Sequence, residues 1–344
     1  MSVVAPIAPA PASAPGYRHS RRKRRLPLWI TVIGWIVVVG LAVVAGMRIF
    51  SWDSLDLFAI LNSVTAFVYL PAWIVAVVAL VGRRYVLAGS ALLIVVAQIA
   101  FMLPELTAAE PLPSWALAAP SIRLFDANVY ASNPSMAGYA EEIKAYQPEL
   151  LTMEEAVPSD VTQLKADGAL ASLPYTVQIK RYDPFAFFVA SMYPLTDVHV
   201  DYLFDQPLIV KMSMQLPSGP QTVWVVHSTG PVPRSFSVWS HQVEEINQQV
   251  RQRGPAGLLL VGDFNSTWGN KWFRQILGAG MTDGAAARAR PFQMTWSQTK
   301  PIIPPAVRID HVLTGSGLAV TTIATGNGPG SDHRDVQATV AFHR

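Results

Sequence analysis

Three nearly continuous apolar stretches close to the N-terminus constrain the fold of this 344-residue chain more than any other feature. They run from Leu26 to Phe50, from Leu57 to Val81 and over about 87–106. Each is close to the ~20 residues that a helix needs to cross a bilayer. Each is also apolar all round, whereas a helix packed on a soluble core shows a single apolar stripe. The sequence therefore predicts three transmembrane helices.

Positive charges set the predicted orientation of these spans. Arginine and lysine fill positions 21–25, Arg83 and Arg84 lie between the second and third spans, and the loop 51–56 has neither residue type. Because cytoplasmic loops carry the excess of such charges, we expect a cytoplasmic N-terminus and an extracytoplasmic location for everything after about Leu106. A secretory signal with a twin-arginine character is the alternative for the first span. The two apolar stretches that follow favour an uncleaved anchor.

The segments that flank the spans have biased compositions. Residues 1–25 combine an Ala/Pro-rich stretch with the basic run. We expect them to be a disordered cytoplasmic tail, because such a segment buries too little apolar surface to offset the entropy lost on ordering. Residues 107–120 are a Pro/Ala-rich linker, and Arg48 lies near enough to the end of its span to reach the membrane interface. The expected location is the cell membrane, with the lipid bilayer as a partner.

The charge of the rest of the chain bears on other partners. Residues 120–344 carry 17 Lys and Arg against 19 Asp and Glu, so the pI near 9.1 reflects the N-terminal part. Sequence-independent binding to nucleic acid depends on many Lys and Arg contacts with phosphates, so we do not expect nucleic acid as a partner. The chain has no cysteine, and the exported domain must be stable without disulfides.

Short strands and helices alternate between Ser121 and Arg344. About eleven strand candidates and four helix candidates follow one another, bounded by turn residues. The helix predicted over 238–251 has the clearest apolar periodicity. One α/β domain over 121–344, with mixed sheets covered by helices, accounts for this order.

Polar side chains interrupt or end these strands at six places. The segments are "FDANVY", "TMEEAV", "VVHSTGP", "LVGDFNS", "RIDHVL" and "GSDHRD". They supply Asn128, Glu155, His227, Asp263, Asn265, Asp310, Asp332 and His333. A single polar residue at a strand end is ordinary turn chemistry. If several converge on one edge, they form a metal and acid/base site.

The residue types favour a hard divalent cation. Carboxylates such as Glu155 and Asp332 suit Mg²⁺ or Mn²⁺, and the absence of Cys and of a His-x-x-x-His pair disfavours zinc. Histidines beside carboxylates suit proton transfer near neutral pH. Glu154 is expected at the surface, because adjacent strand residues face opposite sides, and His311 beside Asp310 is expected to be structural for the same reason.

In this order the motifs resemble those of the endonuclease/exonuclease/phosphatase superfamily, which has the DNase I-like fold. The resemblance covers residues 121–344. It implies a four-layer α/β sandwich of two packed mixed sheets flanked by helices, and a Mg²⁺-dependent phosphohydrolase. The three predicted spans joined to such a domain look most like the membrane-bound VanJ-type proteins associated with teicoplanin resistance.

The resemblance also implies a metal site. Glu155 would be a ligand of Mg²⁺, or of Mn²⁺, with Asn128 and Asp332 at or beside the metal. Tyr130 stands where some endonucleases of the superfamily have a second acidic ligand. This departure puts a two-carboxylate metal site near Asn128 in doubt.

Five further residues take catalytic roles by the same resemblance. Asp263 would position and deprotonate the attacking water, and Asn265 would hold a non-bridging phosphate oxygen. His333 and His227 would face the phosphoryl group, and Asp310 would orient His333. Phosphoryl transfer needs mainly positioning and neutralisation of developing charge, which such a set can supply.

Membrane tethering favours a substrate that the bilayer also holds. The leading expectation is hydrolysis of a lipid diphosphate, such as undecaprenyl diphosphate, at the outer face of the cytoplasmic membrane, with possible glycopeptide resistance as its result. The alternatives are an extracellular nuclease or sphingomyelinase-like phosphodiesterase, and a non-catalytic protein that binds an antibiotic or the cell wall. Arg288, Arg290 and Arg308 are candidates for holding a second phosphate.

Overall fold

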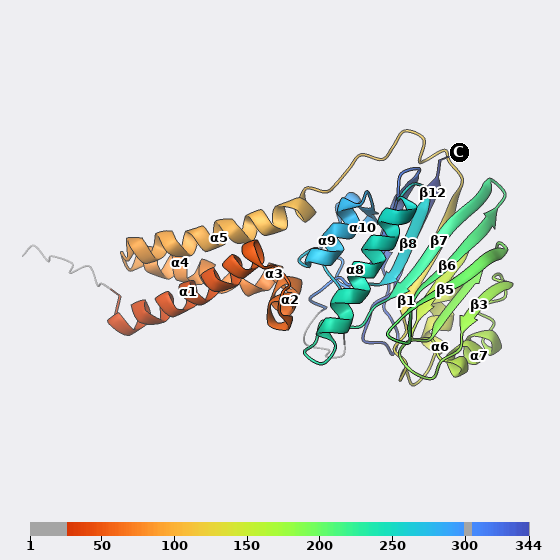
Figure 1. The fold of residues 1–344 in the computed structure, drawn as a ribbon, viewed down its shortest axis with the longest axis horizontal. Helices are drawn as coiled ribbons and strands as arrows, with labels where there is room; N and C mark the ends of the chain where they lie inside the picture. The colour runs from red at the N-terminus through yellow and green to blue at the C-terminus, as the bar shows by residue number, and fades with distance from the viewer. Residues whose placement is uncertain (1–25, 299–304, 344) are drawn as a thin grey trace, which may run out of the picture.

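The computed structural model describes residues 26–298 and 305–343, so the expected tail 1–25 lies outside the described residues. The molecule is elongated (Figure 1). Helices α1, α4 and α5 lie side by side at one end and two β-sheets stack at the other, with the short helices α2 and α3 at the junction.

Two helices of the described chain are long and apolar enough to cross a membrane. They are α1 (Leu28–Phe50) and α5 (Tyr85–Leu106). Large apolar side chains such as Ile36 and Leu93 are more than half exposed along them. Extended apolar faces of this kind mark an interaction surface for lipid or protein.

The second apolar stretch does not form the single straight helix that the sequence predicts. It is divided into α2 (Asp56–Ser63), α3 (Thr65–Val68) and α4 (Leu70–Val81), with a bend of 83° at the break after Ser63. Polar side chains at the break explain it, because Ser63 donates a hydrogen bond to Asn270, 207 residues further along the chain. Three spans would require this bent pair of helices to count as one span.

The α/β part contains two mixed six-stranded sheets. The order in the first sheet is β11 (Leu318–Thr325), β12 (Val336–Phe342), β1 (Ser121–Asn128), β2 (Leu150–Glu154), β4 (Phe187–Ser191) and β3 (Tyr175–Ile179). The order in the second sheet is β5 (Leu195–Leu203), β6 (Gln206–Leu216), β7 (Gly219–His227), β8 (Leu258–Asp263), β10 (Asp310–Thr314) and β9 (Thr282–Asp283). Only β1–β2 and β7–β8 pair in parallel among the pairs of named strands.

Alternation along the strands builds the layers. Leu124 points into the core between the sheets, and its neighbour Phe125 points to the outer layer of helices. Helices α6 (Ala137–Tyr146) and α7 (Pro158–Ala166) cover the first sheet, and α8 (Phe236–Arg253) and α9 (Lys271–Gly278) cover the second. A further short helix, α10 (Gly284–Ala287), follows β9. The predicted DNase I-like α/β fold of two packed mixed sheets with helices is therefore confirmed.

Strand register brings the polar strand ends to one edge of the sandwich. In the first sheet Asn128 pairs with Glu154, both at the carboxyl ends of their parallel strands. In the second sheet Asp263 pairs with His227 on one side and with Asp310 on the other. The ends of four strands and the start of β10 thus frame a single site.

Candidate active site

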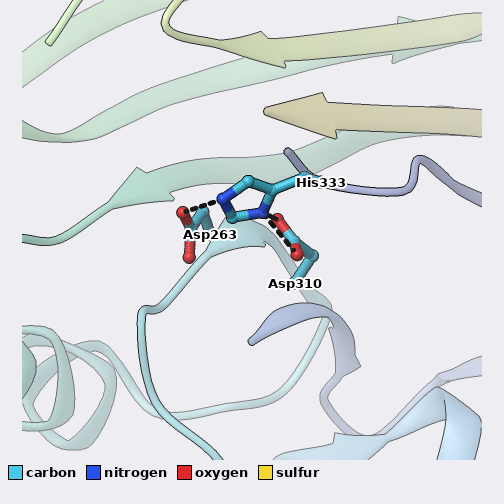
Figure 2. Close-up of side chains that lie close together, drawn as sticks. All are labelled: Asp263, Asp310 and His333. Atoms are coloured by element: carbon cyan, nitrogen blue, oxygen red, sulfur yellow. Dashed lines mark hydrogen bonds and ion pairs between the residues drawn. The ribbon is translucent and has the colours of Figure 1, made fainter. Parts of the chain in front are cut away.

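A buried group of two carboxylates and one imidazole lies at the centre of this edge (Figure 2). The His333 ring lies between Asp263 at the end of β8 and Asp310 at the start of β10. His333 Nδ1 is 2.9 Å from Asp310 Oδ2, and His333 Nε2 is 3.8 Å from Asp263 Oδ2. One ligand atom from each residue lies within 4.8 Å of the others, so the group is compact enough to hold a cation.

Burial and neighbouring charges perturb the pKa values of this group. Burial, followed by the charge of Asp310, raises the pKa of Asp263 to about 8. Burial by itself would lower the pKa of His333, but the charges of Asp310 and Asp263 outweigh it and raise that pKa to about 10. Titratable groups shifted by both burial and specific charged partners are typical of functional sites.

Asn128 connects this group to the first sheet. Its Nδ2 donates to Asp263 Oδ2 and to Glu155 Oε1, both at 3.0 Å. Glu155 follows the end of β2 with a positive φ of 60°, and its Oε2 accepts from the backbone N–H of Ala131 at 2.9 Å. His227 Nε2 lies 3.8 Å from Glu155 Oε1 and 3.7 Å from Asp263 Oδ2. Burial lowers the pKa of His227, which favours its neutral form.

Asn265 lies close to Asp263. Its backbone N–H donates to Asp263 Oδ1 at 2.7 Å, and its side-chain Nδ2 donates to Ser228 O at 2.7 Å and to Asp263 Oδ2 at 3.1 Å. Both amide hydrogens of the side chain are therefore engaged. The amide would have to release one partner before it could donate to a phosphate oxygen.

Asp332 is partly exposed and lies beside His333. Its Oδ1 is 4.0 Å from His333 Nε2, and its Oδ2 accepts from Trp296 Nε1 at 3.0 Å. Its side chain is 22% exposed and that of Glu155 is 15% exposed. Through these contacts the structure joins all eight sequence-predicted residues into one connected site.

The expectation that Glu154 lies at the surface was wrong. Its side chain is fully buried, and neither carboxylate oxygen has a hydrogen-bond partner among the described residues. Burial, followed by the charges of Asp126, Asp310 and Asp263, raises its pKa well above the usual range. The reason is local: Glu154 is the last residue of β2 and points inward, whereas Glu155 lies beyond the strand end, where alternation no longer applies.

Asp126 is a second buried carboxylate, and it is not among the residues predicted from the sequence motifs. Its Oδ1 accepts from Thr152 Oγ1 at 2.6 Å, and burial is the main cause that raises its pKa. The signal was available, because Asp126 lies inside an apolar strand just before Asn128. Gly262 makes room for this layer: a Cβ there would lie 2.2 Å from Val226 O and 2.8 Å from Glu154 Oε1.

The residues present fit a divalent cation. Several carboxylates converge here, and the charge of one imidazolium, His333, does not balance them, so a cation would relieve their repulsion. Glu155 and Asp332 present oxygens at the accessible side, and Asn128 adds a neutral group that fixes Glu155. These three residues, next to the Asp263 group, are the candidates for holding the metal.

Arg308 does not serve as the phosphate-binding residue that the sequence suggested. Its guanidinium is buried, with Nη1 2.6 Å from Asp283 Oδ2 and Nη2 2.6 Å from Glu105 Oε1. His311 packs beside it, with Nδ1 3.0 Å from Arg308 Nη1 and Nε2 3.0 Å from Ser266 O. His311 is therefore structural, as expected.

The fold and the convergent site together define a DNase I-like α/β sandwich with an acidic and imidazole-containing centre. A sequence model described as the endonuclease/exonuclease/phosphatase family matches residues 126–333, a range that includes all eight predicted residues. The chain belongs to this family. Its members are typically phosphoester hydrolases and generally depend on a divalent metal.

Solved structures show the same fold at low sequence identity. One is D. rerio TDP2 in complex with a single-strand DNA product, with a TM-score of 0.54 and 14% identity over 64% of this chain and 99% of the other. Another is an endonuclease/exonuclease/phosphatase family protein from Bacteroides thetaiotaomicron, with a TM-score of 0.53 and 12% identity over 66% of this chain and 99% of the other. No curated protein matches the sequence. These similarities show the fold of the chain and do not identify its substrate.

Proposed function

We propose that this protein is a metal-dependent phosphohydrolase that acts on a lipid diphosphate at the membrane. The observation that carries the proposal is the buried group of Asp263, Asp310 and His333, which Asn128 links to Glu155 at the open edge of the site. Such a set can neutralise phosphoryl charge and activate a water molecule.

This geometry and the family support the residue roles that we propose. Glu155, with Asn128 and Asp332, would hold Mg²⁺, with Mn²⁺ as the alternative, and the metal would supply charge neutralisation at the phosphate. Asp263 takes the proton of the attacking water, and its raised pKa of about 8 is near the value at which a general base works well.

The remaining roles concern the phosphoryl group. His333, held by Asp310, supplies positive charge opposite the phosphoryl group, and His227 supplies a second imidazole. Asn265 orients a phosphate oxygen after release of one of its present partners.

The membrane location supports the choice of substrate. Two helices long and apolar enough to span a bilayer, and a bent pair that can form a third span, lie next to the catalytic part. We place the N-terminus in the cytoplasm and the catalytic domain outside, from the positive charges at positions 21–25. A substrate held in the same bilayer, such as undecaprenyl diphosphate, then meets the site without leaving the membrane. Return of this carrier to wall synthesis would account for teicoplanin resistance of the VanJ type.

Phosphate release by the purified full-length protein tests the proposal. Wild type, Glu155→Ala and the matched surface control Glu141→Ala are compared on undecaprenyl diphosphate in detergent with Mg²⁺, with Mn²⁺ and with EDTA. Glu141 is a fair control, because its side chain is 77% exposed and, among the residues that the structure describes, forms an ion pair with Lys144 alone. We expect metal-dependent release by wild type and Glu141→Ala alone. Release by wild type no faster than by Glu155→Ala would refute the proposal, and nicking of supercoiled plasmid in a parallel assay would favour a nuclease.

A further inference from the structure

The N-terminal helices do more than lie beside the catalytic part, because they contact the loop that follows the catalytic strand β8. Arg48 Nη1, near the end of α1, donates to Gly269 O at 2.8 Å, and Trp52 Nε1 donates to the same oxygen at 2.9 Å. Asp53 Oδ2 accepts from the backbone N–H of Lys271 at 2.6 Å. Arg48 and Asp53 are 5% and 4% exposed, so these bonds are largely shielded from water.

The two backbones also touch directly. A Cβ at Gly269 would lie 1.8 Å from Asn62 O, so only glycine fits against this carbonyl group. Asn270 Nδ2 donates to Ala59 O at 3.1 Å, one turn earlier in α2. This loop contact, between residues 48–63 and residues 267–271, therefore fixes the chain 4–8 residues after Asp263.

A second contact lies two residues before Asp310, the other carboxylate beside His333. Glu105 Oε1, at the end of α5, lies 2.6 Å from Arg308 Nη2. Arg308 is two residues before Asp310 and also pairs with Asp283 of β9. The Glu105 contact thus holds the chain that leads into β10.

The two contacts bracket the active-site pair. Asp263 and Asp310 are directly opposite each other in neighbouring antiparallel strands. The loop contact attaches just beyond the end of β8, and the Glu105 contact attaches just before the start of β10. A relative shift of these two chain ends would move both carboxylates that hold His333.

We propose that helices α1–α5 form part of the catalytic scaffold, with Arg48, Asp53 and Glu105 acting as positioning residues for Asp263 and Asp310. The kinetic test of this inference rests on the proposed hydrolytic function, whereas its hydrogen-exchange test rests on the geometry alone. A linker would suffice to tether a domain to a membrane. Buried charged groups tend to specify one geometry and contribute less to net stability, so they suit a positioning role.

A matched pair of glycine substitutions tests the inference in the full-length protein. Gly269→Ala forces a methyl group into Asn62 O, whereas Gly278→Ala, in the adjoining helix α9, meets nothing within 4 Å. Because small misplacements of catalytic groups reduce the rate strongly, we expect kcat of Gly269→Ala to fall about 10- to 100-fold. KM should change less than about twofold, since no substrate contact is lost. Gly278→Ala should match wild type.

The measurements are hydrolysis of the small soluble ester bis(4-nitrophenyl) phosphate with Mg²⁺, and hydrogen exchange across the whole chain. The soluble ester removes any effect of membrane access. Exchange should rise in residues 264–271 and 305–311 of Gly269→Ala and stay unchanged in β1 and β2. Equal kcat and equal exchange in Gly269→Ala and Gly278→Ala would overturn the inference.

Asp53 provides a second test if Gly269→Ala does not fold. Asp53→Ala removes the acceptor for the Lys271 N–H, whereas Asp53→Asn retains an oxygen acceptor. We expect Asp53→Ala to lower kcat and raise exchange in 264–271, and Asp53→Asn to restore most of both. If wild type hydrolyses neither this ester nor undecaprenyl diphosphate, the proposed function fails separately, and the exchange results alone decide the positioning contact. Exchange in residues 264–271 that stays unchanged in both Asp53→Ala and Asp53→Asn overturns the positioning contact.

Discussion

Two buried carboxylates lie on opposite sides of β10 and differ in how their charge is balanced. Asp283, which pairs with Leu313, accepts from Arg308 Nη1 at 2.6 Å and from Ala285 N at 3.1 Å. Arg308, aided by His311, outweighs the effect of burial and holds the pKa of Asp283 well below its usual range. Asp263, on the other side, has His333 at 3.8 Å as a shared cation, and its pKa is raised to about 8.

The difference separates a carboxylate that is satisfied within the fold from one to which we assign a function. A buried charge with a close guanidinium and hydrogen bonds is satisfied within the fold. The Asp263 side carries Asp126, Glu154 and Asp310 as well, and their repulsion is balanced only in part. Such an imbalance is typical of functional sites, and it supports our proposal that this side of β10 takes a cation and transfers protons.

The Asp263 side of β10, where the negative charges are balanced only in part, is called the unbalanced side below. The largest expected effect comes from neutralising Asp263 on this side. Asp263→Asn keeps the shape and removes the base, so we expect kcat to fall about 10⁴-fold, the upper range for a general base. Stability in the absence of metal should stay equal or rise, because one of several repelling carboxylates is lost. Phosphate release and thermal unfolding with EDTA measure the two effects. Loss of activity together with clear destabilisation would place Asp263 with Asp283 in the structural class.

Most of this site could be predicted from the sequence, because each residue stands out locally. Asp263 and Asn265 follow an apolar strand, and Asp332 and His333 lie in a Gly-rich loop. Their convergence follows from the register of β7, β8 and β10, which the sequence expresses only through the family order of motifs. The burial of Glu154 was not predicted, because the alternation of side chains along a strand does not show whether Glu154 or Glu155 is its last residue.

The bend in the second apolar stretch could not be predicted for a different reason. Hydropathy reads Leu57–Val81 as one span, and the polar residues Asn62 and Ser63 look like minor interruptions. Ser63 has a partner about 200 residues away in the loop after β8, as its bond to Asn270 shows, and the backbone carbonyl of Asn62 lies against Gly269 of the same loop. Local patterns contain no information about a contact between such distant segments, and the same holds for the pairing of Glu105 with Arg308.

The next largest effect should come from breaking the ion pair between Arg308 and Asp283 on the other, balanced side of β10. Arg308→Met leaves Asp283 buried without its guanidinium, which costs about 3–5 kcal/mol of unfolding free energy when one partner of a buried pair is removed. Chemical denaturation in detergent measures the loss. A decrease below about 1 kcal/mol would show that Trp268 and the Ala285 N–H suffice to hold Asp283.

The pH dependence of that stability has a definite sign. In wild type the pKa of Asp283 is lowered on folding, so its contribution is present above the unfolded value of 3.8 and is lost as pH falls below it. In Arg308→Met burial dominates and the pKa rises, so the contribution of Asp283 should become more unfavourable as pH rises above 3.8. A variant that loses the same free energy at every pH would contradict this account.

A smaller effect is expected for Asn128, a neutral side chain that orients carboxylates on the unbalanced side. Asn128→Ala removes the amide that donates to both Glu155 and Asp263. Groups that orient metal ligands typically contribute about 10- to 100-fold in metal affinity. The Mg²⁺ concentration for half-maximal phosphate release should rise by that factor, and saturating Mg²⁺ should restore most of kcat. An unchanged Mg²⁺ midpoint would remove Asn128 from the metal site.

The smallest expected effect comes from Glu154, which lies on the unbalanced side and has no hydrogen-bond partner among the described residues. Burial favours the protonated form of this carboxyl group and raises its pKa, so Glu154→Gln keeps the shape of the side chain and mimics that form. Below the unfolded value of 4.5, where the wild-type group is protonated in both states, stability should differ by less than about 1 kcal/mol, as for a substitution without a large-effect mechanism. A raised folded pKa makes the wild-type contribution full below the unfolded value of 4.5 and progressively smaller as pH rises. Glu154→Gln has no such titration, so the stability of the variant relative to wild type should increase as pH rises.

Unfolding measured at pH 5, 7 and 9 distinguishes the cases. A constant difference between the two proteins would mean that Glu154 is ionised in the fold, and that the unbalanced side holds even more negative charge than its contacts indicate.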